Sequence, residues 1–212
     1  MERNQSNMTD VRVEESHVDL AAKWIISSGI QSDQGGFFAW FNLQDKSYSY
    51  LYSEITGYGI TSLLFLYKIF GEKAFIDKAE QAADWIISKS IHSCGGVKTR
   101  LYEDNKKADK RYCFTGEKIF SFDTGIVLYG IINLYKLTGK AKYLQISESL
   151  ADFIIDKMHQ QDGSLSPIYD AKIGETIESE DKWSNQQSGF HAKVSMGLVD
   201  LYGIKRNNKY RD

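Results

Sequence analysis

The chain repeats itself about every 68 residues, and no other feature of the sequence restricts its fold as strongly. Residues 66–71 (Leu-Tyr-Lys-Ile-Phe-Gly) recur as residues 134–139 (Leu-Tyr-Lys-Leu-Thr-Gly), a spacing of 134 − 66 = 68 residues. Residues 83–88 (Ala-Asp-Trp-Ile-Ile-Ser) recur as 151–156 (Ala-Asp-Phe-Ile-Ile-Asp), with an earlier copy at 22–27. Repeats of this length indicate stacked supersecondary units, none of which can bury its apolar face alone.

The apolar residues predict six helices, at 16–28, 56–71, 72–90, 123–138, 140–158 and 190–204. Three of them, at 56–71, 123–138 and 190–204, are apolar on nearly all sides, which is typical of a helix buried all round. The others carry one apolar stripe and a polar face. The sequence therefore predicts an all-α chain in which inner and outer helices alternate, as in an α/α-toroid or an arc of one. A four-helix bundle would make every helix amphipathic, and a solenoid of short helical repeats is the nearest alternative.

Composition narrows the class of protein. The net charge of −2 comes from interspersed signs without a basic stripe, which argues against a nucleic-acid partner. No apolar run approaches the roughly 20 residues that span a membrane, and the first residues lack the apolar core of a signal peptide. Two cysteines make no disulfide framework, so we expect a reduced, cytoplasmic protein. We expect a flexible N-terminus at 1–13 and a single domain at 14–212.

Three long connections, at about 29–55, 91–121 and 159–188, all run from an outer to an inner helix, so we expect them on one face. Long loops in a compact domain are usually functional. They deliver Glu54, Asp123 and His191 to the starts of the inner helices, and Asp123 and His191 are 68 residues apart, like the repeat. Two carboxylates and an imidazole in one cavity are suited to general acid–base catalysis, and paired carboxylates cleave glycosides.

Other residues near these helix starts are candidates for binding substrate. Aromatic faces stack on sugar rings, which favours Trp40, Tyr58 and Trp183 as walls of the site, with Asp181 beside Trp183. Thr124 is a further candidate. The alternative for Thr56, Asp123 and Thr124 is that they only cap free backbone N–H groups at helix starts.

The sequence predicts neither a metal nor a cofactor. His92, Cys94 and Cys113 lack the second pair of ligands that a zinc site needs. Phosphate-binding, nucleophile-elbow and dinucleotide motifs do not occur.

Several phrases, in their order along the chain, resemble those of six-hairpin glycosidase-like α/α-toroid proteins of the kind encoded with surface-polysaccharide biosynthesis genes. The resemblance covers residues 20–204, and its phrases are Gly35-Gly36-Phe37, residues 53–58 (Ser-Glu-Ile-Thr-Gly-Tyr), residues 122–125 (Phe-Asp-Thr-Gly), residues 161–164 (Gln-Asp-Gly-Ser) and residues 190–193 (Phe-His-Ala-Lys). It implies a carbohydrate-active protein of surface-polysaccharide metabolism, acting as a glycoside hydrolase, lyase or epimerase on a carbohydrate substrate. A complete toroid of this kind has about twelve helices, so six helices imply an incomplete one of about three hairpins. The chain would then belong to a larger toroid or be completed by a homo-oligomer or a partner chain.

Two alternatives remain at this point. The chain could be a non-catalytic helical scaffold or glycan-binding module, in which case its carboxylates would not be needed for binding. A terpenoid-cyclase-like toroid would have an apolar cavity without carboxylates, and the acids carried on the loops argue against it.

Overall fold

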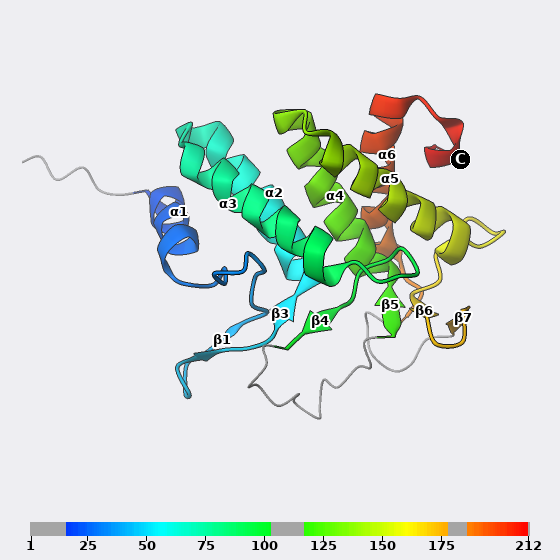
Figure 1. Cartoon of the computed structure of the whole chain (residues 1–212), viewed down its shortest axis with the longest axis horizontal. Coiled ribbons are helices and arrows are strands. Elements are labelled where there is room, and N and C mark those ends of the chain that lie inside the picture. The colour runs from blue at the N-terminus through cyan, green and yellow to red at the C-terminus, as the bar shows by residue number, and fades with distance from the viewer. Residues whose placement is uncertain (1–15, 103–116, 178–185, 212) are drawn as a thin grey trace, which may run out of the picture.

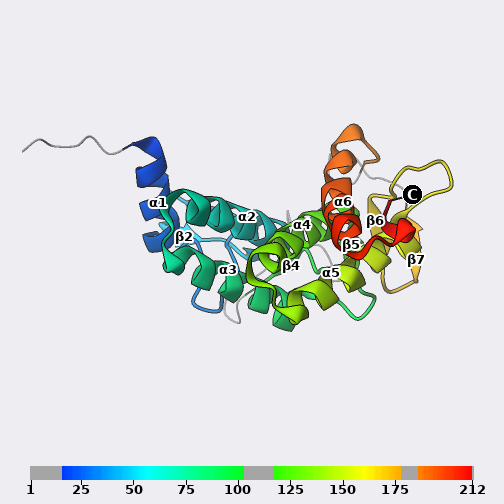
Figure 2. The same ribbon diagram turned by 90° about the horizontal axis from the view of Figure 1, so that it is seen from above.

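The computed structural model describes residues 16–102, 117–177 and 186–211, in which six α-helices form an arc (Figure 1). The helices are α1 (His17–Ser27), α2 (Ser53–Phe70), α3 (Lys73–Trp85), α4 (Ser121–Thr138), α5 (Ala141–Phe153) and α6 (Val194–Lys205). Seen from above, α2, α4 and α6 form one layer, and α3 and α5 form a second layer beside it (Figure 2). The predicted alternation of inner and outer helices in an incomplete α/α-toroid is confirmed.

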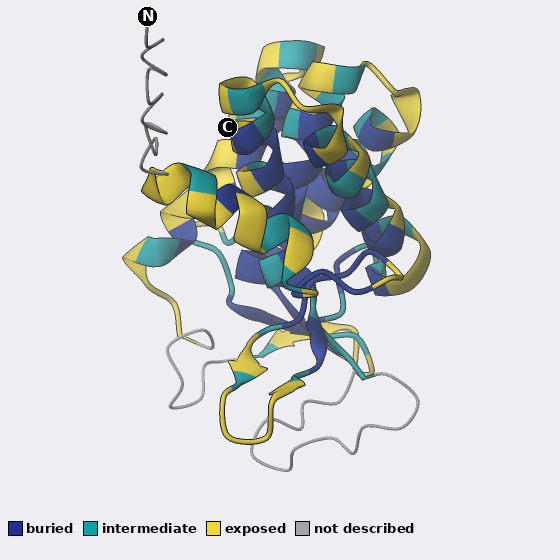
Figure 3. Cartoon of the chain, turned by 90° about the vertical axis from the view of Figure 1, so that its left-hand side faces the viewer, coloured by how far each residue is buried: buried dark blue, intermediate teal, exposed yellow. Residues whose placement is uncertain are grey.

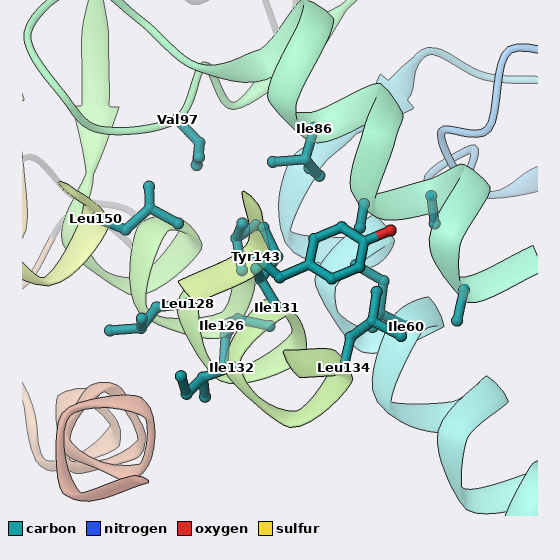
Figure 4. Packing of buried hydrophobic residues seen from close by; sticks show 14 of the residues in the cluster. Ile60, Ile86, Val97, Ile126, Leu128, Ile131, Ile132, Leu134, Tyr143 and Leu150 are labelled. Carbon is teal, nitrogen blue, oxygen red and sulfur yellow. The ribbon is translucent and has the colours of Figure 1, made fainter. Parts of the chain in front are cut away.

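Helix α4 forms the centre of the hydrophobic core because it packs between α2, α5 and α6. Its residues Leu128, Ile131, Ile132 and Leu134 are completely buried, and Tyr143 of α5 lies among them (Figure 4). Burial is concentrated between the helices and continues into the connections next to them, whereas the lower ends of these connections are exposed (Figure 3). The all-round apolar pattern of α4 therefore has its expected cause in burial from every side.

The outer helices α3 and α5 each end in one wider turn. Helix α3 continues as a π-helical turn at Ile86–Ser90, and α5 continues as a π-helical turn at Ile154–Met158. The two turns occur at the same place in the repeat, and each closes the predicted long helix at its C-terminal end. At the third inner helix, a 3₁₀ turn at Gly189–Lys193 precedes α6, where the sequence predicted a single helix.

The long connections lie together below the helices, as predicted, but they contain short strands that the sequence analysis missed (Figure 1). Strand β1 (Phe41–Asn42) pairs with β2 (Ser47–Tyr48), and β3 (Leu51–Tyr52) pairs with β4 (Arg100–Leu101). Strands β5 (Lys118–Phe120), β6 (Ile168–Asp170) and β7 (Glu175–Ile177) form a three-stranded antiparallel sheet. The β3–β4 ladder joins the first long connection to the second, and the β5–β6 ladder joins the second to the third, so pairing fixes the connections relative to one another.

A turn with the same hydrogen bonds precedes each inner helix. At residues 32–36 the N–H of Ser32 donates to the carbonyl of Gly36 (2.8 Å), and that of Gly35 donates to Ser32 (2.9 Å). The same pair of bonds occurs at residues 92–96 (2.8 and 2.9 Å) and 160–164 (2.9 and 3.0 Å). Gly35, Gly95 and Gly163 adopt φ values of +109°, +108° and +86°, which only glycine adopts without strain.

Two threonines attach these turns to the inner helices, which corrects the predicted helix starts. Thr56 Oγ1 accepts from the N–H of Phe37 (2.9 Å), and Thr124 Oγ1 accepts from that of Val97 (3.3 Å). Each hydroxyl also donates to the carbonyl four residues earlier, at 2.8 and 2.9 Å. Because α2 and α4 begin at Ser53 and Ser121, the threonines lie inside the first turn, and the prediction that they cap the helices is wrong.

An aromatic ring of an outer helix covers each of the first two turns. A Cβ atom added to Gly36 would lie 2.5 Å from the Trp85 ring of α3, and one added to Gly96 would lie 2.7 Å from the Phe153 ring of α5. Both rings are almost completely buried. Among the residues that the structure describes, no helix is long and apolar enough to cross a membrane.

We predict that Gly36→Ala lowers stability because the new methyl group collides with a ring that has no room to move. Overpacking of this kind costs about 1–3 kcal/mol, equivalent to several degrees in Tm for a chain of this size. Thermal unfolding followed by circular dichroism measures the shift. The matched control is Gly189→Ala, whose added Cβ meets nothing within 4 Å. Equal Tm values for the two variants would contradict the packing described here.

Candidate active site

Glu54 and Asp123 lie in the first turns of α2 and α4, two helices that pack side by side. In the repeat, Glu54 corresponds to Phe122, so the two carboxylates occupy successive positions and not equivalent ones. Successive residues on a helix point about 100° apart. The charge of Glu54 reaches Asp123, whose pKa it raises, and both acids raise the pKa of Tyr52.

Asp123 is the more deeply buried member of the pair, with 2% of its surface exposed. Burial raises the pKa of its carboxyl well above the usual range, and the nearby charge of Glu54 raises it further. Thr99 and Arg100 lower this pKa, but to a smaller extent. The Oδ2 atom has no hydrogen-bond partner among the described residues, so the carboxyl retains a free position for a proton or a ligand.

Glu54 is less buried, with 9% of its surface exposed, and its surroundings favour its charged form more strongly. Burial raises the pKa of this carboxyl, whereas the hydrogen bond from the Tyr52 hydroxyl and the charge of Lys193 lower it. Two nearby acids cannot both be charged without repulsion. The pKa of the Asp123 carboxyl is raised the more strongly, so Asp123 is the acid whose surroundings favour the protonated form.

The neighbours of the two acids come from all three repeats. Tyr52 and Arg100 face each other across the β3–β4 ladder, which links the first and second long connections. Lys193 comes from the 3₁₀ turn before α6, and its Nζ lies 5.9 Å from the centre of the Tyr58 ring. Burial and then the charges of Glu54 and Asp123 raise the pKa of Tyr58. Of the residues predicted to bind substrate, Tyr58 is thus the one beside the acid pair.

A cluster of aromatic rings leads from the acid pair to the surface. The Tyr50 ring lies 6.0 Å from Tyr52 and 5.0 Å from Trp40. The Arg100 guanidinium stands over the Tyr50 ring at 4.9 Å. Trp40 ends this cluster at the surface, with 40% of its surface exposed, and its role as a wall of the site stays a prediction.

Two of the predicted residues have other surroundings. Thr124 is completely buried. Its hydroxyl accepts from the Val97 N–H after the second glycine turn and donates to the Phe120 carbonyl, so both hydrogen-bonding directions are used within the fold, and its role in substrate binding stays a prediction. His191 stacks on Phe190 at 4.3 Å and lines a groove of about 570 Å³ beside α6. Its Nε2 has no hydrogen-bond partner within the described part of the chain, and burial lowers its pKa. Asp181 and Trp183 lie outside the described residues.

The sequence analysis did not select Tyr52, Arg100 or Lys193. The signal for Lys193 was present, because it lies two residues after His191 at the start of the third inner helix. Tyr52 and Arg100 gave no sequence signal, since their proximity depends on a strand pairing between residues 48 positions apart. Within the described ranges, no cluster of three or more His, Cys, Asp or Glu side chains has the arrangement of a metal site.

Comparison with known families identifies the chain at this point. Residues 1–210 match the profile of glycosyl hydrolase family 76. The chain belongs to this family. This family match does not show a link to surface-polysaccharide biosynthesis genes. A comparison with curated proteins gave no match.

Solved structures with the same fold come from several carbohydrate-active proteins. The cellobiose 2-epimerase of Bacillus thermoamylovorans has a TM-score of 0.72 and 16% identity over 91% of this chain and 50% of its own. The family 76 α-mannanase of Bacteroides thetaiotaomicron has a TM-score of 0.61 and 13% identity over 78% and 42%. An inactive variant of a Salegentibacter α-1,6-mannanase, in complex with α-1,6-mannotetrose, has a TM-score of 0.58 and 12% identity over 75% and 43%. The chain thus spans about half the length of these structures, and the likeness shows the fold.

We predict that Asp123→Asn stabilises the protein at neutral and alkaline pH. A carboxyl whose pKa is raised on folding stabilises the folded state only while it is protonated. The wild type therefore loses stability as the pH rises from about 4, the usual pKa of an aspartate, towards the raised value. The variant lacks this loss, so its stability curve should be flatter and higher above that window.

Urea unfolding at a series of pH values measures the effect, which amounts to about 1.4 kcal/mol for each unit by which the pKa is raised. Glu175→Gln, a change at an exposed carboxylate in β7, is the control and should follow the wild type. A variant that is less stable than the wild type at pH 8 would show that Asp123 is needed in its charged form.

Proposed function

We propose that the chain carries a glycoside-hydrolysing site in which Glu54 and Asp123 act as the acid–base pair. The observation that supports this proposal most strongly is the coupled, buried carboxyl pair at the loop face of a family 76 chain. Glycoside cleavage needs one protonated and one charged carboxyl group. The surroundings of Asp123 favour its protonated form, and those of Glu54 favour its charged form more strongly than those of Asp123 do.

In this proposal Asp123 is the general acid and Glu54 the base. Asp123 donates its proton to the glycosidic oxygen as the bond from the sugar's anomeric carbon to that oxygen breaks. Glu54 removes a proton from the water whose oxygen forms the new bond to the same carbon. Tyr52 and Lys193 favour the charged form of Glu54, while burial favours the protonated form of Asp123. His191, predicted to act with this pair, lies in surroundings that favour a role outside the proton transfer.

The aromatic cluster supports a carbohydrate as the ligand. Trp40 presents an exposed ring at the outer end of the cluster, and Tyr58 presents its ring beside the acids. Rings of this kind stack on the apolar faces of sugars while their polar atoms remain hydrated. A chain of several sugar units would then extend from the acid pair along the cluster towards Trp40.

Mannose-containing glycans are the first substrates to test because the family 76 neighbours are described as mannanases. One sequence feature separates this chain from one of them. The inactive Salegentibacter mannanase carries alanine in place of two consecutive aspartates. This chain contains no two consecutive aspartates, and Asp123 is followed by a threonine. The acid pair proposed for this chain therefore consists of Glu54 from α2 and Asp123 from α4, and not of two consecutive aspartates.

A second candidate function is glycan binding without turnover. The burial of Asp123 favours it, because a carboxyl with 2% of its surface exposed needs some opening of the site before it can reach a glycosidic oxygen. The exposed Trp40 is compatible with either function. A role in surface-polysaccharide metabolism and a cytoplasmic location remain predictions from the sequence.

We predict that the wild type releases reducing ends from α-1,6-mannan oligosaccharides, and that Glu54→Gln and Asp123→Asn each lower the rate by about 10²- to 10⁴-fold. Chromatography of the products measures turnover, and a product of unchanged size but altered configuration would indicate an epimerase instead. Glu175→Gln should retain full activity. Wild-type rates in the Glu54→Gln variant would overturn the assignment, and unaltered binding without any turnover in the wild type would favour the binding module.

We predict that Trp40→Ala weakens binding of the same oligosaccharides by about 5- to 100-fold, which corresponds to about 1–3 kcal/mol for one lost stacking ring. Isothermal titration calorimetry measures the affinity. Leu43→Ala removes another exposed apolar side chain of the same loop and should leave the affinity unchanged. Equal affinities for both variants would exclude Trp40 from the site.

A further inference from the structure

Both ends of the arc present unfilled helix-packing surfaces. One end consists of α6 and the other of α1 and α2, and they lie at opposite sides of the molecule (Figures 1 and 2). We propose that a second copy of this chain closes the arc into a ring, with α6 of each copy packed against α1 and α2 of the other. The proposal rests on the packing of the helices and not on the proposed activity.

The contacts between inner helices follow a register that can be counted from their ends. Each inner helix ends at a residue with left-handed φ, namely Gly71, Gly139 or Arg206. Nine residues before Gly139, a Cβ added to Gly130 would lie 3.4 Å from the Cβ of Ile60, which stands eleven residues before Gly71. The small residue nine positions before the end of one inner helix thus packs against the residue eleven positions before the end of the preceding inner helix.

The α4–α6 contact repeats this register. A Cβ added to Gly197, nine residues before Arg206, would lie 2.7 Å from the Leu128 side chain, eleven residues before Gly139. At the two ends of the arc the same positions lack a partner helix. Ser195 holds the eleventh position of α6, Ser62 holds the ninth position of α2, and both are exposed. The register therefore places Ser195 of one copy against Ser62 of the other.

An apolar residue of α6 marks the same open surface. Seven residues before the helix ends, Leu64 of α2 and Ile132 of α4 are 5% and 0% exposed. Val199 holds this position in α6 and is 62% exposed. The first two are covered within the arc, whereas no helix in the described part of the chain covers Val199, which leaves an apolar surface for a partner.

Each covered glycine turn packs under the aromatic ring of the outer helix that follows it in the chain, and not under that of the outer helix before it. The first turn packs under Trp85 and the second under Phe153, which are the second and third aromatic residues of the outer-helix repeat. The first of these aromatic residues, Trp24 of α1, is 55% exposed. In the third turn Ser164 holds the position of Gly36 and Gly96, and a Cβ added to Gly163, the equivalent of Gly35 and Gly95, would meet nothing within 4 Å among the described residues. In the ring, Trp24 of each copy would cover the third turn of the other copy.

The residues after α6 reproduce the beginning of an outer helix. In α5, Lys142 forms a salt bridge with Asp84 of α3, and burial and the charge of the same carboxylate raise the pKa of the neighbouring Tyr143. After α6, Lys209 lies 2.8 Å from Asp152 of α5, and the Tyr210 hydroxyl lies 3.5 Å from the same atom. Helix α1 matches only the later turns of an outer helix. In the ring, α1 of one copy would continue behind Tyr210 of the other.

The surfaces at the two ends of the arc are both apolar grooves of similar volume. The groove beside α6, about 570 Å³, is lined by Leu198, Val199 and Tyr210. The groove between α1 and α2, about 580 Å³, is lined by Val18, Trp24 and Phe65. Each apolar groove takes a helix from the opposite end of another copy. Closure in this way makes two identical contacts, as a two-fold axis requires.

The closed ring has the size of the related folds. The described part of one copy supplies three inner and three outer helices, and two copies supply twice as many. The chain overlays half of the cellobiose 2-epimerase structure. Closure would place two Glu54–Asp123 pairs at one central cavity, so that each site gains its remaining walls from the other copy.

Cysteine cross-linking tests the register. In a background with both native cysteines changed to serine, we expect the double variant Ser62→Cys, Ser195→Cys to form a disulfide-linked dimer of about twice 24.2 kDa on a non-reducing gel. The 3.4 Å Cβ separation of the equivalent internal pair suits a disulfide. A mixture of the two single variants should also cross-link, whereas neither single variant should do so alone. Light scattering on the wild type should give the dimer mass.

The matched control is Ser62→Cys, Ser88→Cys, which carries two exposed cysteines outside the proposed register and should remain uncrosslinked. A monomeric wild type at 100 μM, or no cross-link in the Ser62–Ser195 variant, would overturn the proposal and assign the open surfaces to another polypeptide. Cross-linking of Ser195→Cys by itself would overturn it too, because it indicates a symmetric contact of α6 with α6. None of these results depends on catalytic activity.

Discussion

The structure depends on close contact between neighbouring inner helices, which small residues at defined positions permit. Gly130 of α4 meets the backbone of α2 at Gly57, and Gly197 of α6 meets Leu128 of α4. A larger side chain at either glycine would separate the helices and open the core around Ile131 and Ile132. Because the helices approach so closely at their N-terminal ends, the first turns of α2 and α4 also lie near each other. The acid pair is a consequence of this contact.

The same packing explains how the site keeps two acids in a low-polarity environment. The β3–β4 ladder places Tyr52 and Arg100 beside the acids, and the glycine turns fix the loops by hydrogen bonds to Thr56 and Thr124. These contacts hold the surroundings of Glu54 and Asp123 in place, and burial raises the pKa of both carboxyls. An uncompensated buried acid weakens folding and is typical of functional sites. In this chain it coincides with the aromatic cluster that ends at Trp40.

Repetition connects the fold to its assembly. Within the arc, Ile60 and Leu128 each meet a glycine of the next inner helix, and Trp85 and Phe153 each cover a glycine turn. At the ends, Ser195, Val199, Trp24 and Gly163 hold the same positions without the partner that the repeat provides elsewhere. The arc is thus a series of repeated contacts that is open at both ends. A second copy would give each of these end residues the kind of partner that its equivalents have inside the arc.

The sequence by itself determined the number, order and layering of the helices, because burial from all sides or from one side leaves a direct imprint on apolar spacing. It also placed Glu54 and Asp123 on one face, since that face follows from the alternation of long and short connections. The tertiary structure alone decided which candidates meet. Thr124 proved to be a structural clamp, His191 turned into a groove beside α6, and Lys193 approached Glu54. These outcomes depend on the one-residue difference in register between the acids and on strand pairings between distant loops, neither of which leaves a periodic signal in the sequence.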